Sequence, residues 1–319
     1  MMTIYRWENG GLKETPEFSP SCWINLVEPS TTELESVISH SGKIPRDFLT
    51  DPLDAGERPR FDYEDEASLI IVHVPMPVDD DEVTPYRTVP LGIIFFERSV
   101  ITVCSARTPV TSAFLDQIRR VCPPSDQYRF AFRLLWHAGV LFLRYINDIH
   151  QRTIDLEGEL HKSISNELLL KLLQIEKTFV YFTTSLKADT IALARANTAR
   201  QLSLSEDDRD SLEDAMVEYQ QALETATIHA AVLNGTMDTF ASVINNNLNR
   251  VMKWLAVATI FLAVPTVVTS AFGMNVNLPF IDDPGQGAEW VFWALSGICA
   301  VVLAGVSALL VYLKKRRVF

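Results

Sequence analysis

Two uncharged apolar segments lie close together near the end of the chain. Residues 254–272 and 290–313 contain no Asp, Glu, Lys or Arg and are rich in Val, Leu, Ala and Phe. A helix needs about 20 apolar residues to cross the hydrocarbon core of a bilayer. The pattern therefore predicts two transmembrane helices, over 254–272 and 290–313, joined by a loop over 273–289.

The charges that flank these segments predict their orientation. Arg250 and Lys253 precede the first segment, and the second is followed by Lys314, Lys315, Arg316 and Arg317. The charged residues of the intervening loop are all acidic: Asp282, Asp283 and Glu289. Because basic flanks stay on the cytoplasmic side, we expect a multi-pass protein of the cell membrane. Both termini, including the basic tail 314–319, would be cytoplasmic, and the acidic loop would lie outside.

Upstream of these segments, apolar residues recur at three- and four-residue spacing, which predicts long helices. Stretches 128–163 and 166–201 predict a cytosolic helical hairpin within residues 126–204. A third helix is expected to begin after Ser205, a typical N-cap that precedes three acidic residues. Since no strong stop occurs before Phe272, this helix would be on the order of 100 Å long. Residues 205–253 would then form a stalk that leads into the first span.

Residues 1–125 have the pattern of a mixed α/β domain. Short β-branched or aromatic runs predict strands over 22–27, 68–74, 87–96 and 99–104. Helices are expected over 31–41, with Ser30 or Thr31 as N-cap, and over 111–121. The expected fold class is α+β: a cytosolic α/β domain and a long stalk helix that runs into the first of two C-terminal transmembrane helices.

One face of the first span is polar or small. Its members recur at alternating four- and three-residue steps: Asn245, Asn249, Met252, Ala256, Thr259, Ala263, Thr266 and Ser270. Small residues, Thr and Ser also favour tight packing between transmembrane helices. The alternative is a pore lined by several copies of this helix, which requires an oligomer because one helix cannot enclose a pore.

Composition narrows the choice of function. The formal net charge is −12, so nucleic acid is not an expected partner, since phosphate binding needs a basic face. The four cysteines have no zinc-site spacing. The sequence contains no P-loop, no GxSxG and no GxGxxG string. We therefore expect neither an enzyme nor an organic cofactor.

The first span is followed at once by Gly273, Met274 and Asn275. With this motif between two C-terminal spans, the sequence resembles the CorA family of magnesium transporters, whose signature is Gly-Met-Asn at this position. The string Val251-Met252-Lys253 and the acidic stretch 57–66 also match the family. The resemblance is strongest from about Asn245 to the end of the chain.

The resemblance implies a funnel-shaped homopentamer that lies in membrane lipid and carries divalent metal cations. Gly273, Met274 and Asn275 would form the selectivity filter, where amide oxygens hydrogen-bond a hydrated Mg²⁺ without removing its water. Asn249, Met252 and Leu255 would lie at the cytosolic constriction, with Ala263 and Thr266 further along the pore. Transport would be passive uptake of Mg²⁺, with Co²⁺ or Ni²⁺ as further cargo, driven by the membrane potential.

The resemblance also implies that cytosolic Mg²⁺ closes the pore by binding carboxylates between subunits. The positions that match those carboxylates approximately are Asp65, Glu66, Asp214 and Asp238. The alternative for each is a solvated surface carboxylate.

Two other functions stay open from sequence alone. The ZntB branch of the superfamily, which transports zinc, shares the Gly-Met-Asn motif, and the loop 276–280 lacks the Met-Pro-Glu-Leu string of typical magnesium transporters. A two-span membrane sensor or anchored enzyme is the second alternative. The short loop between the spans cannot fold as a ligand-binding domain, and no catalytic motif supports an anchored enzyme.

Overall fold

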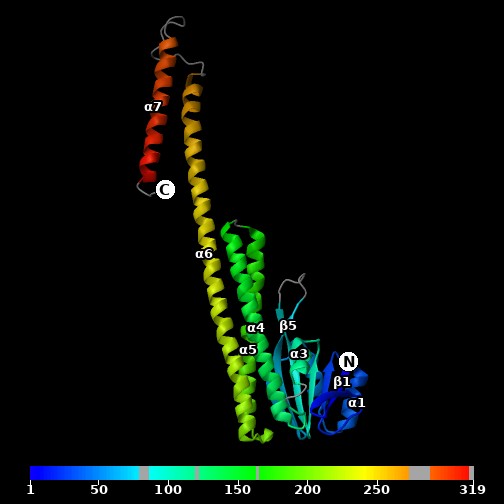
Figure 1. Cartoon of the computed structure of the whole chain (residues 1–319). Helices are drawn as coiled ribbons and strands as arrows, with labels where there is room; N and C mark the ends of the chain where they lie inside the picture. The colour runs from blue at the N-terminus through cyan, green and yellow to red at the C-terminus, as the bar shows by residue number, and fades with distance from the viewer. Residues whose placement is uncertain (79–85, 119–121, 163–164, 273–287, 316–319) are drawn as a thin grey trace. The chain divides into compact units, whose positions relative to one another are not determined.

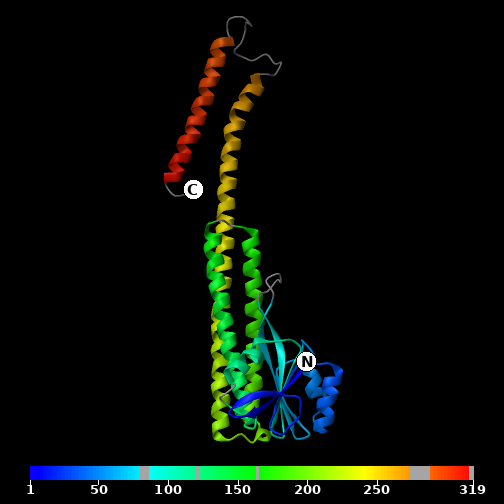
Figure 2. The same ribbon diagram turned by 45° about the vertical axis from the view of Figure 1, so that its right-hand side comes forward.

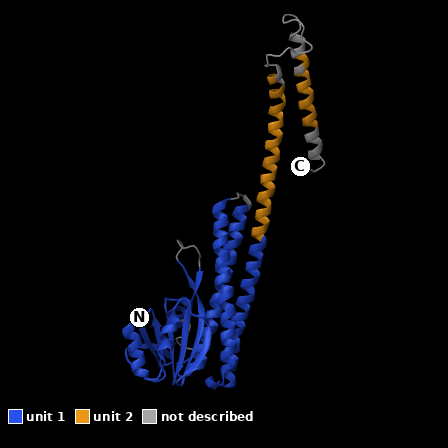
Figure 3. Ribbon diagram, turned by 180° about the vertical axis from the view of Figure 1, so that it is seen from behind, with its two compact units in different colours: residues 1–235 blue, residues 236–319 orange. Residues whose placement is uncertain are grey.

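The computed structural model describes residues 1–78, 86–118, 122–162, 165–272 and 288–315. The chain divides into two compact units, Met1–Gly235 and Thr236–Phe319 (Figure 3). Helix α6 (Glu206–Phe272) contributes residues to both.

The first unit is built around a seven-stranded sheet in the order β2-β1-β3-β7-β6-β5-β4. Strands β3 and β7 pair in parallel, with Asn25 opposite Thr102, and the remaining neighbours pair antiparallel. The strands are β1 (Met2–Glu8), β2 (Gly11–Thr15), β3 (Trp23–Val27), β4 (Arg60–Glu64), β5 (Ala67–Pro77), β6 (Tyr86–Phe96) and β7 (Ser99–Cys104).

Helices cover both faces of this sheet (Figures 1 and 2). On one face, α1 (Thr31–Ser41), α2 (Arg46–Thr50) and the 3₁₀ turn η1 (Asp51–Leu53) enclose an aliphatic core that includes Leu26, Val37 and Leu49. On the other face, α3 (Pro109–Ile118), α4 (Gln127–Lys162) and α5 (Asn166–Thr198) pack through aromatic rings. The Trp23 ring contacts Phe114 and Phe130 there. Burial on both faces explains the nearly continuous apolar runs of β5, β6 and β7.

The helix starts follow the polar residues that precede them. The Ser205 hydroxyl accepts a hydrogen bond from the backbone N–H of Asp208 at 3.2 Å, and the Asp208 carboxylate accepts one from the Ser205 N–H at 3.1 Å. This reciprocal pair caps α6 at the expected residue. A second 3₁₀ turn, η2 (Arg200–Leu202), connects α5 to α6.

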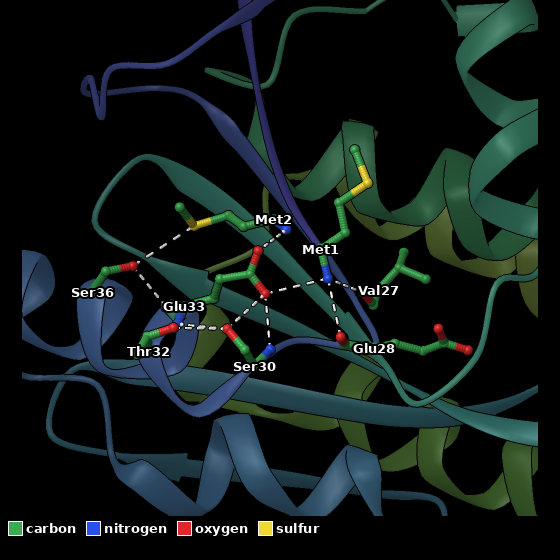
Figure 4. A network of polar contacts seen from close by, with 8 residues as sticks. All are labelled: Met1, Met2, Val27, Glu28, Ser30, Thr32, Glu33 and Ser36. Atoms are coloured by element: carbon green, nitrogen blue, oxygen red, sulfur yellow. Dashed lines mark hydrogen bonds and ion pairs between the residues drawn. The ribbon is translucent and has the colours of Figure 1, made fainter.

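Helix α1 has the same kind of cap at Ser30, one of the two expected N-cap residues. The Glu33 carboxylate accepts hydrogen bonds from the backbone N–H groups of Ser30, at 2.8 Å, and of Met2, at 2.7 Å (Figure 4). These hydrogen bonds lower the pKa of Glu33, and the one from the Ser30 N–H has the larger effect. The contact with Met2 ties the start of α1 to strand β1.

The second unit contains the end of α6 and helix α7 (Ala288–Lys315). The two helices include the segments 254–272 and 290–313 that the sequence predicts to cross a membrane. Among the described residues, the helical segment Glu206–Val267 contains an apolar stretch long enough to cross a membrane, and this stretch is 0% buried within the chain. Ser296–Ala308 is a shorter apolar stretch.

Candidate pore helix and cation-binding residues

The residues predicted to line a pore lie on one continuous helix. At 3.6 residues per turn, the stripe from Asn245 to Ser270 falls within an arc of about 100°, and Leu255 lies at its edge. All nine predicted pore residues are exposed in the single chain. The structure thus places them on a shared, uncovered face of α6.

The threonines of this face use their protons within the helix. The Thr259 hydroxyl donates to the Leu255 carbonyl at 2.9 Å, and the Thr266 hydroxyl donates to the Leu262 carbonyl at 2.7 Å. Each hydroxyl oxygen therefore keeps its lone pairs for other donors. Such a face accepts hydrogen bonds, as the outward O–H groups of a hydrated cation require.

Sequence reasoning missed Pro265, which lies inside α6. A proline has no N–H to donate to the carbonyl four residues earlier, here that of Phe261. Transmembrane helices tolerate such a position when neighbouring groups satisfy the free carbonyl. The sequence does show this feature, because a proline in the middle of the apolar segment 254–272 indicates an interrupted hydrogen bond in the predicted helix.

The predicted filter residues Gly273, Met274 and Asn275 lie outside the described residues. Helix α6 ends at Phe272, immediately before them.

Asp65 and Glu66 form the two-residue turn between β4 and β5. Glu64 and Ala67 pair on either side, and both turn residues have positive φ, 47° for Asp65 and 69° for Glu66. This geometry is that of a type I′ hairpin turn. The Glu66 carboxylate accepts a hydrogen bond from the Lys43 ammonium at 2.8 Å, which lowers the pKa of Glu66. Asp65 and Glu66 are both exposed at this tip.

Asp51, together with Glu57 and Asp62 of the acidic stretch 57–66, surrounds Arg60. Asp51 lies 2.6 Å from the Arg60 guanidinium, which also bonds Glu57 and Asp62. Because Arg60 offsets part of their charge, these three carboxylates are less suited than Asp65 to hold a cation.

Asp214 and Asp238 are exposed residues of α6 and fall in the first and second unit, respectively. Within the described part of the chain, no group of three or more His, Cys, Asp or Glu side chains is arranged to hold a metal ion. The structure therefore joins Asp65 and Glu66 in one turn and does not gather them with Asp214 into a site of the single chain.

The fold and this helix match a known family. The family described as CorA-like Mg²⁺ transporter protein matches residues 19–316. The chain belongs to this CorA-like family. Its members are transporters, so the chain is a CorA-type transporter of Mg²⁺ or another divalent cation and is not an enzyme.

Individual relatives agree with this assignment. The cobalt/magnesium transport protein CorA of Methanocaldococcus jannaschii is 27% identical over 295 residues, which cover 88% of this chain and 87% of that protein. The complete structure of the CorA magnesium transporter from the same organism superimposes with a TM-score of 0.81 at 23% identity. That comparison covers 97% of this chain and 96% of the other, so the CorA fold extends over nearly the whole chain.

A domain of a ZntB protein also has a similar fold. The cytoplasmic domain of ZntB from Vibrio parahaemolyticus has a TM-score of 0.56 at 11% identity, over 78% of this chain and 98% of that domain. At this identity the likeness concerns the fold alone. The CorA relatives cover more of the chain at higher identity.

Proposed function

We propose that this CorA-type chain forms a homopentameric channel in the cell membrane that admits hydrated Mg²⁺ passively. The observation that carries the proposal is the uncovered polar face of α6, from Asn245 to Ser270. Five copies of that face would enclose a polar path, while Trp254 and Leu262, which lie off that face and are 65% and 73% exposed, would meet lipid or α7 of a neighbour. Both termini would lie in the cytoplasm.

The chemistry of this face suits a hydrated ion. Mg²⁺ gives up its water reluctantly, and its bound waters direct O–H groups outward. The Thr259 and Thr266 hydroxyls, whose protons are bound to backbone carbonyls, would accept from those waters. Neutral oxygens hold the ion less tightly than carboxylates would, and conduction requires release as well as capture.

The Gly273-Met274-Asn275 motif would form the filter at the outer mouth, with Asn275 side chains contacting the hydrated ion. The membrane potential supplies the driving force. A divalent ion gains about 4.6 kcal/mol in crossing 100 mV.

A liposome experiment tests this proposal. The purified chain should carry Mg²⁺ at a rate that rises with an inside-negative potential, and Asn275→Ala should abolish the flux. Asn277→Ala, two residues away, is the matched control and should retain flux. The mass of the detergent-solubilised particle should correspond to five copies of the 35.9 kDa chain.

The same liposomes separate magnesium from zinc transport. Zinc flux that depends on a proton gradient, without any Mg²⁺ flux, would assign the chain to the ZntB-like alternative. A monomeric particle would instead favour the two-span sensor.

Closure by cytosolic Mg²⁺ would involve Asp65, Glu66, Asp214 and Asp238 from neighbouring subunits. All four side chains are exposed in the single chain, where a cation bridging two subunits could reach them. Removal of the cation would restore repulsion between carboxylates and open the pore. Asp214→Asn and Asp238→Asn should weaken inhibition by internal Mg²⁺, whereas Asp210→Asn, an exposed carboxylate one turn before Asp214, should not.

A further inference from the structure

Two histidines stack face to face between helices α4 and α6. The ring centroids of His150 and His229 are 3.9 Å apart, and the ring planes differ by 20°. The Phe179 ring on α5 lies 6.2 Å from His229, so three helices meet at this point. Both histidines are half-buried, and protons from solvent can therefore reach the stacked rings.

Close packing of α4 and α6 holds the two rings together. A Cβ atom at Gly139 would come within 2.8 Å of the Glu218 Cβ, so the helices are in near contact there. His150 and His229 each lie eleven residues further along their helices. Eleven residues make about three turns, so the two helices run in the same direction and are still in contact at the histidine pair.

This stacked geometry does not accommodate two positive charges without repulsion. Histidine is the side chain that ordinarily gains a charge between pH 8 and 5. Two unit charges about 4 Å apart repel even when water screens them fully, and they repel more strongly in a half-buried contact. Two sites that interact in this way take up their protons in two steps, and the second step requires a lower pH than the first.

The helices around the pair supply no counter-charge to the rings. The charged residues nearest to the pair along α4, α5 and α6 are Asp148, Arg152, Glu176, Lys177 and Glu224. Asp148 and Arg152 pair with each other at 2.9 Å. Within the described parts of the chain, neither imidazole forms a hydrogen bond or an ion pair, and burial, followed by the neighbouring His150, lowers the pKa of His229.

We propose that the His150–His229 stack is an acid-sensitive contact, which holds α4 against α6 while at most one ring is protonated and separates when both rings are charged. The separated chain binds a proton on each imidazole near the usual pKa of about 6.5, whereas the stacked pair resists the second proton. The contribution of the stack to stability is therefore complete above that pH and is lost as the pH falls. Each proton taken up on separation shifts the equilibrium by up to about tenfold per pH unit.

The pair lies in the first unit, before the predicted pore face that begins at Asn245, and it includes none of the four carboxylates proposed to sense Mg²⁺. The inference therefore does not rest on the proposed channel mechanism. Acid would loosen α6 from α4 in the helical bundle, independently of the transported ion.

Hydrogen exchange of the full-length protein in detergent, measured at pH 8 and pH 5 and corrected for the intrinsic pH dependence of exchange, tests the proposal. The amides of α4 and α6 that flank the pair report the local opening equilibrium. The variants are His150→Phe, His229→Phe and the double variant, because phenylalanine keeps a flat ring that cannot be charged. Acid should open the wild type at least about fivefold more than any of the three, which is the repulsion of two charges about 4 Å apart in water.

The double variant should respond to acid like either single variant, since loss of one charge already removes the repulsion. An equal acid response in the wild type and all three variants would overturn the proposal. The buried His73 and His137, whose pKa values burial also lowers, are present in every variant and contribute the same background.

His40→Phe is the matched control, since His40 is an exposed histidine stacked on Phe18 with no second imidazole in that contact. It should keep the acid response of the wild type. A response reduced as much as that of His229→Phe would overturn the assignment to this pair.

A second measurement does not depend on the stability of the variants. Diethyl pyrocarbonate modifies neutral imidazole, so the pH dependence of its initial rate at His229, read by mass spectrometry, reports the protonation of that ring. In His150→Phe the midpoint should move to higher pH, because no second charge opposes the proton. The His40→Phe midpoint should equal that of the wild type, and an unchanged midpoint in His150→Phe would also overturn the proposal.

Discussion

The Asp189 carboxyl group accepts a hydrogen bond from the backbone N–H of His73, with 2.7 Å between the nitrogen and Oδ1. This contact joins α5 to strand β5 in the interior, where Asp189 is 0% exposed. Among the described residues, no group bonds its second oxygen, and the buried Tyr219 hydroxyl on α6 likewise has no partner. Burial raises the pKa of Asp189 well above its usual value, although the His73 N–H opposes this. Burial therefore favours the neutral, protonated form of Asp189.

We expect Asp189→Asn to be at least as stable as the wild type at neutral pH. An acid whose pKa is raised by folding binds its proton more tightly in the folded state. Its contribution to stability is complete below the unfolded pKa of about 3.9 and is lost as the pH rises toward the folded pKa. The asparagine amide is neutral at every pH, and its oxygen can still accept from the His73 backbone N–H. The variant should therefore not lose stability as the pH rises.

Thermal unfolding midpoints measured from pH 4 to 8 check this expectation. The Asp189→Asn curve should be flatter than the wild-type curve. Asp189→Ala is the control and should lower stability by about 1–3 kcal/mol, because it leaves the buried His73 N–H without an acceptor. A less stable Asn variant at neutral pH would mean that Asp189 is ionised.

Gly139→Ala should destabilise the helical bundle. The new Cβ would lie 2.8 Å from the Glu218 Cβ, closer than carbon atoms pack, so α4 and α6 must separate. This strain should exceed the gain of about 0.5–1 kcal/mol that alanine brings to a helix interior. Gly158→Ala in the same helix is the matched control, since nothing lies within 4 Å of its Cβ position. The two thermal midpoints should move in opposite directions, and a rise in both would contradict the close approach.

Thr102→Val should destabilise the sheet although it preserves side-chain shape. The Thr102 hydroxyl accepts from the Trp23 indole N–H and donates to the Asn25 side-chain oxygen, both at 2.9 Å. Valine leaves a buried donor and a buried acceptor unpaired, at a cost of about 1–3 kcal/mol each. Thr102→Ser keeps the hydroxyl and should cost only about 0.8 kcal/mol for the lost methyl group. Denaturant unfolding should give a higher free energy of unfolding for Thr102→Ser than for Thr102→Val. The reverse order would mean that the hydrogen bonds of Thr102 to Trp23 and Asn25 do not stabilise the fold.

Thr266→Val should reduce Mg²⁺ flux severalfold if α6 lines the pore. The substitution replaces a hydroxyl oxygen on the polar face with a methyl group, and an apolar ring in a narrow pore opposes hydrated ions. Thr269→Val is the control, because Thr269 lies off that face and its hydroxyl donates to the Thr266 carbonyl at 3.1 Å. Mg²⁺ uptake into liposomes compares the two. Equal flux in both variants would place the pore elsewhere.

The sequence predicts best those elements that are buried on both sides or capped by polar residues. Strands β3, β5, β6 and β7 and helices α4, α5 and α6 begin and end within a few residues of the predicted limits. Strands β1, β2 and β4 were missed because they lie toward the edges of the sheet and carry charged residues such as Arg6, Lys13 and Asp62. Their apolar signal is confined to one face or to a few positions.

Contacts between distant segments could not be predicted in the same way. Asp189 looks like any helical carboxylate until β5 and α6 close around it, and His150 and His229 are 79 positions apart without a spacing rule to join them. Eight of the nine predicted pore residues follow from helical periodicity, and Leu255 follows from the family resemblance; the structure supplies the continuous helix. Their role stays a prediction, as do those of Gly273–Asn275 and the four carboxylates.

The turn at Asp65 and Glu66 allows both carboxylates to be removed without a loss of hairpin stability. Left-handed backbone costs a residue with a Cβ atom about 1–2 kcal/mol, and Asn-Gly is the pair that type I′ turns prefer. Asp65→Asn with Glu66→Gly should therefore strengthen the hairpin while it removes both carboxylates. A loss of cation response in that double variant could not be blamed on a weakened fold.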